Sequence, residues 1–152
     1  MEKMRLYLDI CVYNRPFDDQ RQTRIVIETL EFLYLLSMAE KGEITLVNSF
    51  AIEDENSKNP YANRKDIIND ILATTTENID YDEDLGDRAR ELEKLGIMSM
   101  DALHIACAEK AKADFFVTCD DILVRKYEGN KKRIKVKIAP LMEFINREVF
   151  KI

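Results

Sequence analysis

The sequence predicts an α/β fold, a three-layer α/β/α sandwich with a central, mostly parallel sheet. Short, strongly apolar runs alternate along the chain with longer segments whose apolar residues recur at helical spacing. Buried parallel strands and the helices that cover them have these two patterns. The chain has 152 residues and neither an internal repeat nor a low-complexity linker. We therefore expect one domain over residues 1–152.

The first half of the chain is expected to hold two strands and three helices. The strands are Met4–Leu8 and Ile44–Asn48, with a loop over Asn14–Asp19, and the helices are Gln22–Lys41, one that begins at Phe50 and one from about Tyr61 to Thr75. Gly42 stands where a C-terminal cap belongs, and Ser49 can cap the second helix. Asn59-Pro60 ends that helix, because the residue before a proline avoids helical geometry.

The second half is expected to add two strands and four helices. An exposed acidic connection over Asn78–Asp87 leads into a helix over Asp84–Leu95, and Gly96 then breaks the chain. Ser99 is the expected N-cap of the next helix, Met100–Ala113, which is apolar almost all round in its first turns and therefore buried. The remaining elements are a strand Phe115–Thr118, a short helix Asp120–Tyr127, a strand Ile134–Ala139 and a terminal helix from Leu141.

Composition excludes several classes of protein. With 23 basic and 29 acidic residues the formal charge is −6, which argues against a protein that binds duplex nucleic acid over its whole surface. The longest apolar run, Phe32–Leu36, is far too short to span a membrane, and Met1–Arg5 leads into a strand and not a secretion signal. We expect a cytoplasmic protein with no membrane contact. Three cysteines outside any CxxC motif indicate neither a disulfide framework nor a zinc site.

Basic residues gather in one segment, Arg125–Lys137, which has seven Lys or Arg against one Glu. The rest of the chain then holds 16 basic and 28 acidic residues, a balance of −12. Ile134, Val136 and Ile138 alternate with Lys135 and Lys137, so we expect a strand with one buried and one lysine face. Those lysines either protect an edge strand from aggregation or bind an RNA backbone.

Four acidic residues should meet at one edge of the sheet. Asp9 ends the first strand, Glu55 lies in the helix after the second, Asp101 is in the first turn of the buried helix, and Asp120 follows the third strand. Strand C-termini and helix N-termini share one edge of a parallel sheet, which is where ligands bind. Such carboxylates repel one another unless a cation neutralises them.

With one histidine, His104, a metal site must be built mainly from carboxylates, which select Mg²⁺ or Mn²⁺. Ions held in this way activate water and stabilise charge on a phosphodiester. We expect metal-assisted phosphodiester hydrolysis with metal-activated water as the nucleophile. His104 lies one turn beyond Asp101, either as a packed, hydrogen-bonded residue or as a ligand; we favour the former.

The chain resembles the PIN domain family over essentially its whole length. The resemblance rests on Leu6–Asp19 (LYLDICVYNRPFDD), on Ser49 with Glu55 six positions on, on Met100–Ala106 (MDALHIA) and on Phe116–Asp121 (FVTCDD). It implies a compact α/β/α ribonuclease, with Asp9, Glu55, Asp101 and Asp120 as metal-binding and catalytic residues. Many such proteins are toxins of prokaryotic VapBC toxin–antitoxin systems, so it also implies an RNA substrate, an antitoxin partner and a homodimer, for which the Gln22–Lys41 helix is a candidate surface.

Several positions keep alternatives. Glu53 or Asp54 could replace Glu55. Cys11 stands where the family often has Ser, Thr or Asn, so Thr118 or Asn14 is expected to support the metal site instead. Arg15 and Asn14 are the loop residues expected to contact substrate, although Arg15 could instead pack over Phe17. Asp121 is expected to be a helix-start residue rather than a metal contact, and the cysteines to be small buried side chains rather than a redox switch.

Two other functions compete with a metal-dependent endoribonuclease acting on single-stranded or looped RNA. One is a catalytically silent PIN-like module that binds RNA or protein, against which the intact Asp9, Asp101 and Asp120 argue. The other is a phosphatase of the haloacid dehalogenase type. That chemistry needs a second Asp two residues after the first, where this chain has Cys11.

Overall fold

A computed structural model describes residues 3–152, so Met1 and Glu2 of the N-terminal segment discussed above lie outside the described residues. Within residues 3–152, five strands form one sheet in the order β3-β2-β1-β4-β5, and every neighbouring pair is parallel. The strands are β1 (Met4–Leu8), β2 (Ile44–Ser49), β3 (Glu77–Ile79), β4 (Phe115–Thr118) and β5 (Lys137–Pro140). The predicted α/β class with a parallel central sheet is confirmed.

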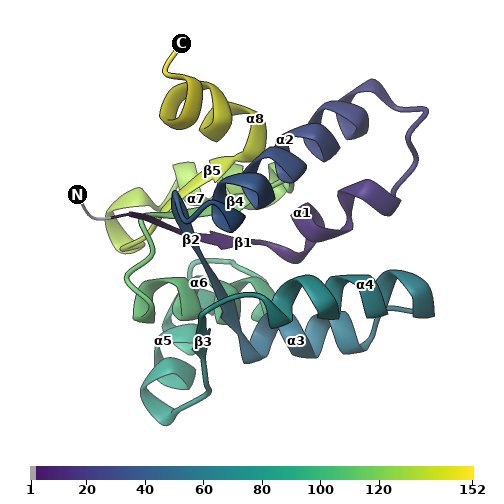
Figure 1. Ribbon diagram of the computed structural model, residues 1–152. Helices are drawn as coiled ribbons and strands as arrows, with labels where there is room; N and C mark the ends of the chain where they lie inside the picture. The colour runs from purple at the N-terminus through teal and green to yellow at the C-terminus, as the bar shows by residue number, and fades with distance from the viewer. Residues whose placement is uncertain (1–2) are drawn as a thin grey trace.

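Helices cover both faces of this sheet, α2 and α8 on one side and α5 and α6 on the other (Figure 1). The helices are α1 (Ile10–Asn14), α2 (Thr23–Glu40), α3 (Phe50–Ser57), α4 (Ala62–Ala73), α5 (Glu83–Glu93), α6 (Ser99–Lys110), α7 (Asp121–Glu128) and α8 (Leu141–Phe144), which continues as a π-helix over Ile145–Phe150. Short 3-10 turns follow α1 at Arg15–Phe17 and α7 at Lys131–Arg133. Over the part of the chain that the structure describes, no helix is both long and apolar enough to cross a membrane.

Two of the three helix caps that the sequence predicts are present. The Ser49 hydroxyl accepts a hydrogen bond from the Ile52 N–H at 3.1 Å, and Gly42 follows α2 with a φ of +74°, so both predicted caps are confirmed. The expectation for Ser99 is wrong. It is the first residue of α6, behind an N-cap at Met98, and makes no capping bond with its side chain.

Three segments differ from expectation. Helix α1, whose N-cap Asp9 accepts from the Ile10 N–H, leads into the expected Asn14–Asp19 loop, and Arg15–Phe17 inside that loop forms a 3-10 turn. The acidic connection begins with a strand, β3, which sequence periodicity does not reveal because it is a short, half-exposed edge strand of three residues. Strand β5 begins at Lys137 and not at Ile134. Its partner β4 has only four residues, so only Lys137–Pro140 can pair.

The predicted burial pattern before and along β5 is nevertheless confirmed. Ile134, Val136 and Ile138 are buried, whereas Lys135 and Lys137 are exposed. Strand β5 lies at one edge of the sheet. Exposed lysines on an edge strand discourage pairing with other chains, so the structure supports this role for Lys137, and Lys135 lies just before the strand.

The strand order places a crevice at the carboxyl edge of the sheet. The chain leaves central strand β1 toward β2 on one side, and β4 pairs with β1 on the other, so the topology reverses direction between β1 and β4. In parallel α/β sheets, ligands bind outside the carboxyl ends of the strands at such a switch point. Asp9 follows β1 and Asp120 follows β4 shortly after its end, so both acids lie at this crevice.

Candidate active site

Asp9 is held at the carboxyl end of β1 by contacts on both of its oxygens. Its side chain is 5% exposed. One oxygen accepts from the Ile10 N–H and the other from the Thr118 hydroxyl, each at 2.8 Å. Burial raises the pKa of this carboxyl, and the nearby His104 and the hydrogen bond from Thr118 partly offset that rise. Asp9 is therefore a fixed acid whose negative charge is poorly compensated.

Thr118 links Asp9 to Asp120. Its hydroxyl donates to Asp9 and accepts from the backbone N–H of Asp120 at 3.0 Å. Asp120 itself caps α7, with one oxygen accepting from the N–H groups of Ile122 and Leu123. The expected supporting position of Thr118 is thus present in the geometry.

Cys11 lies two residues after Asp9, in α1. Its sulfur accepts from the Cys119 N–H at 3.2 Å and lies 3.5 Å from the Thr118 hydroxyl. The thiol thus fixes the turn after β4, and its interaction with Asp9 is a minor cause that lowers the pKa of that carboxyl. Cys107 and Cys119 are buried, and all three thiols are free.

Glu55 reaches the same edge from α3 and meets His104 of α6. The Nε2 atom of His104 lies 2.7 Å from Glu55 Oε1, and its Nδ1 atom lies 2.7 Å from the Tyr7 hydroxyl. Tyr7 in turn contacts the Ser49 hydroxyl at 2.6 Å. His104, Tyr7 and Ser49 are all fully buried, so His104 is the packed, hydrogen-bonded residue that we favoured.

The partners assign the direction of this hydrogen-bond relay, which we define as Ser49–Tyr7–His104–Glu55. Wherever the Glu55 carboxylate accepts, Nε2 of His104 donates, and in the tautomer that carries its proton on Nε2 alone Nδ1 accepts from Tyr7. The Tyr7 oxygen accepts from Ser49, whose own oxygen accepts from the Ile52 N–H. The relay therefore returns to α3, the helix that carries Glu55, and fixes the orientation of that carboxylate.

The carboxylates gather at one edge of the sheet as the topology predicts, and two of them lie closer together than the others. Ligand atoms of Asp9, Glu55 and His104 all lie within 4.8 Å of one another. Asp101 is close enough that Asp9 and Asp120 help to raise its pKa to about 6, with burial as the largest cause. The groups that perturb Asp101 are carboxylates and His104, without a lysine or arginine. This site of hard oxygen donors with excess negative charge suits a divalent cation.

The alternative acids have other partners. Glu53 accepts from Asn48 at 3.1 Å, and Asp54 pairs with Lys58 at 3.1 Å, so the position in the cluster falls to Glu55. Asp121 is in the first turn of α7 and binds both terminal nitrogens of Arg24, at 2.7 and 2.9 Å. That pairing lowers the pKa of Asp121 and makes it a structural residue.

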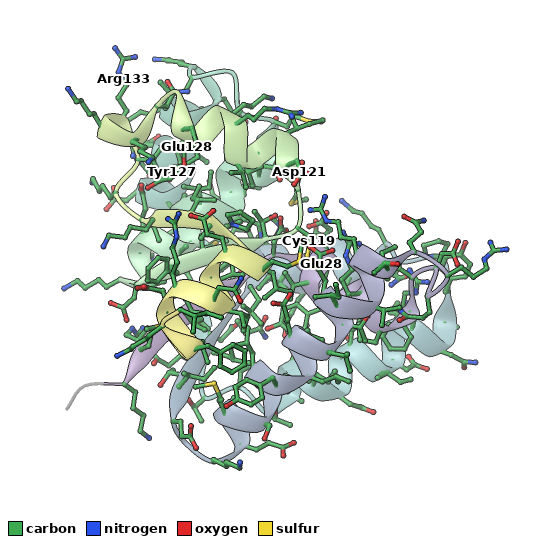
Figure 2. The ribbon with its side chains drawn as sticks, turned by 90° about the horizontal axis from the view of Figure 1, so that it is seen from above. Glu28, Cys119, Asp121, Tyr127, Glu128 and Arg133 are labelled. Atoms are coloured by element: carbon green, nitrogen blue, oxygen red, sulfur yellow. The ribbon has the colours of Figure 1, made fainter. Side chains whose placement is uncertain are left out.

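Arg15 is held in a structural network. Its Nε donates to Glu28 at 2.9 Å and its terminal nitrogen to Asp18 at 2.8 Å, and Glu28 is only 1% exposed. Arg24 connects the same Glu28 to the Cys119 carbonyl, and Figure 2 shows Glu28 and Cys119 side by side. It is Arg64, not Arg15, whose guanidinium lies over the Phe17 ring. Substrate contact by Arg15 and Asn14 stays a prediction.

A hollow of about 390 Å³ opens beside Glu55, where α1 and the Arg15–Phe17 turn face the α3–α4 connection. Its lining includes Asn14, Arg15, Glu55, Lys58, Tyr61 and Arg64. Sequence reasoning missed the last three. The signal was present as an aromatic and a basic residue three positions apart, at the start of the helix that follows the one carrying Glu55.

Comparison with known proteins identifies the family and supports the fold. The family model described as PIN domain matches residues 7–129, a range that contains all four acids. A search of curated proteins found no match. Among solved structures, the chain is similar to a chain of VapBC2 from Rickettsia felis, crystallised with a DNA fragment from their promoter. That similarity has a TM-score of 0.55 at 21% identity and covers 90% of this chain and 98% of the other, so it supports the fold.

Proposed function

The chain belongs to the PIN domain family, whose members are generally nucleases, and we propose that it is a Mg²⁺- or Mn²⁺-dependent endoribonuclease. One observation carries the proposal. Asp9 and Glu55 converge with Asp101 and Asp120 at the switch point of the sheet, where burial and mutual repulsion raise the pKa of Asp101 to about 6. Carboxylates held in this way are costly to the folded chain unless a cation joins them.

The residues fit a divalent cation. Asp9 and Glu55 would hold it first, with Asp101 and Asp120 completing the oxygen donors. A divalent cation, when bound, supplies positive charge that acidifies water and stabilises negative charge on a phosphodiester. Thr118 keeps Asp9 oriented, the relay keeps Glu55 oriented, and the burial of Asp9 limits competition from bulk water.

A cleavage assay tests the proposal. We expect the purified chain to cut single-stranded or looped RNA with Mn²⁺ or Mg²⁺ and not with EDTA. Asp9→Asn and Asp101→Asn should abolish cleavage. Asp121→Asn is the matched control, because Asp121 has the same chemistry but is engaged by Arg24. Equal cleavage by the wild type and by both site variants would refute the assignment.

The basic segment is a candidate surface for the RNA backbone. Within residues 3–152, six of its cations have no ion pair: Arg125, Lys126, Lys132, Arg133, Lys135 and Lys137. Helix α7 leads from Asp120 toward them over about 12 Å, and Figure 2 shows Asp121 and Glu128 near its two ends with Arg133 beyond. Glutamate substitution at Lys132 and Arg133 should weaken RNA binding and flatten its salt dependence. Unchanged affinity and salt slope would refute RNA binding by this part of the segment.

We also propose that the chain is the toxin of a toxin–antitoxin pair. The support is the similarity to a chain of a VapBC complex, together with an apolar surface on α2. Ile27, Leu30, Leu33 and Tyr34 are between 41% and 62% exposed there, and apolar side chains gathered on one surface mark protein contacts. We expect homodimerisation through α2. Leu30→Glu should shift sedimentation toward the monomer, and an unchanged sedimentation coefficient would exclude α2 as the contact.

One observation favours the silent PIN-like module as a second candidate. Each acid except Asp101 already has an internal partner: Asp9 has Thr118, Glu55 has His104, and Asp120 caps α7. Isothermal titration with millimolar Mn²⁺ separates the two functions. Binding lost in Asp9→Asn supports the nuclease, and no binding by the wild type supports the silent module.

A further inference from the structure

We propose that the hollow beside Glu55 binds one nucleotide of a single-stranded RNA, with its base stacked on Tyr61 and its phosphate near Lys58. This inference rests on the proposed function, because it assigns the substrate of that same site. We name this hollow the Tyr61 hollow, and it is lined by Asn14, Arg15, Glu55, Lys58, Tyr61 and Arg64 among others.

The Tyr61 ring is supported on one side and open to solvent. The Arg64 guanidinium lies 4.8 Å from the centre of the Tyr61 ring, and Arg64 is itself anchored by the Phe17 carbonyl at 2.7 Å. The Tyr61 N–H donates to the Asn59 side chain at 3.1 Å, which fixes the backbone. Tyr61 is nevertheless 62% exposed. A rigid aromatic ring with free surface is the platform on which single-stranded nucleic acids stack their bases.

Among the charged side chains that line the Tyr61 hollow, Lys58 is the one that can bind an anion. Lys58 pairs with Asp54, but both side chains are more than half exposed, so this pair is weak and the ammonium can turn toward a phosphate. Asp18, which also lines the hollow, is already paired with Arg15 and Arg64. The negative charge left in the lining is Glu55, which points into the carboxylate cluster.

The position of the hollow connects it to the reaction. Glu55 belongs both to the lining and to the carboxylate cluster, so a nucleotide in the hollow adjoins the bond presented to the acids. A base can stack on Tyr61 only when it has left its own helical stack. The site therefore selects single-stranded segments or loops over duplexes.

Binding without cleavage tests this inference directly. The chain contains no tryptophan, so Tyr61→Trp places a single fluorescent reporter at the hollow. With EDTA present, a ten-nucleotide single-stranded oligouridylate should quench that fluorescence, whereas a double-stranded RNA of equal length should quench it far less. By titration, Tyr61→Leu should weaken oligouridylate affinity about tenfold, in line with about 1–3 kcal/mol per stacked base. Tyr61→Phe should stay within about twofold.

Tyr81→Leu is the matched control, since Tyr81 is 55% exposed but packs against Phe50 at the opposite end of α3. We expect wild-type affinity for it. The inference is overturned if Tyr61→Leu binds as well as the wild type, or if polyglutamate or duplex RNA quenches the reporter as strongly as oligouridylate does. The binding assay in EDTA does not depend on metal, so it is independent of the cleavage assay in Mn²⁺. Binding as expected without any cleavage would refute only the proposed function. Cleavage with unchanged Tyr61→Leu affinity would refute only this inference.

Discussion

Replacing Asp101 with asparagine should stabilise the metal-free protein while removing its activity. Burial and the charges of Asp9 and Asp120 raise the pKa of Asp101 from 3.8 to about 6. At 1.36 kcal/mol per pKa unit, this rise lowers the free energy of unfolding by about 3 kcal/mol when Asp101 is ionised. Asp101 is half-buried, so solvent screening reduces the expected effect to about 1–2 kcal/mol.

The pH dependence of the effect has a definite sign. A carboxyl whose pKa is higher in the folded chain takes up protons on folding, so its ionised form destabilises the native state. The penalty is absent below about pH 4, grows between pH 4 and 6, and is complete above the folded pKa of about 6. Asp101→Asn should therefore exceed the wild type in free energy of unfolding at pH 8 and equal it near pH 4.

Urea unfolding in EDTA, followed by circular dichroism, measures this difference. Asp121→Asn removes the same charge but loses its pairing with Arg24, so it should not be stabilised at pH 8. Saturating Mn²⁺ should reverse the order, since a metal at 100 times its Kd adds about 2.7 kcal/mol to a protein that binds it. An Asp101→Asn variant no more stable than the wild type at pH 8, or one whose advantage persists at pH 4, would refute the reasoning.

Three further predictions concern residues away from the cleavage chemistry. Tyr7→Phe interrupts the relay behind Glu55 and should weaken Mn²⁺ binding about 10- to 100-fold by isothermal titration. Tyr13→Phe is the control and should leave Mn²⁺ affinity unchanged, because it removes a buried hydroxyl without a hydrogen-bond partner among residues 3–152. Equal affinities of the two variants would show that the relay does not support the metal site. Glu28→Ala leaves Arg15 with Asp18 alone and should cost about 2 kcal/mol in urea unfolding, the size of a hydrogen bond to a charged group. No loss of stability would show that Glu28 contributes little. Lys112→Gly relieves a φ of +54° and should raise stability by about 1 kcal/mol, and a loss would contradict strain at that position.

Much of the fold could be predicted because local signals and the global architecture agree. Strand β1 and strand β4 read as apolar runs because both are buried at the centre of the sheet. Helix α2 ends where Gly42 supplies a left-handed residue. Local patterns failed where pairing partners decide the outcome. Strand β3 is a strand only because β2 lies beside it, and β5 begins only where β4 offers a partner.

The four acids were predictable for a topological reason. Strand ends and helix starts of a parallel sheet share one edge, so Asp9, Asp101 and Asp120 could be placed there from their positions in the sequence alone. The sequence left Glu53, Asp54 and Glu55 as alternatives, because a shift of one residue turns a side chain by about a quarter of a helical turn. The contact between Glu55 and His104, made across two helices far apart in the sequence, selects Glu55.

By itself the sequence determined the order of the main elements, the α/β class and the edge at which its acids would collect, because these depend on periodicity and chain order. The tertiary structure alone decided which groups touch. In the tertiary structure Arg15 lies in a buried ion network, and Tyr7 links His104 to Ser49. Packing between α1 and the α3–α4 connection also leaves the hollow lined by Tyr61. Those outcomes depend on side-chain packing between segments distant in the sequence, which no local pattern encodes.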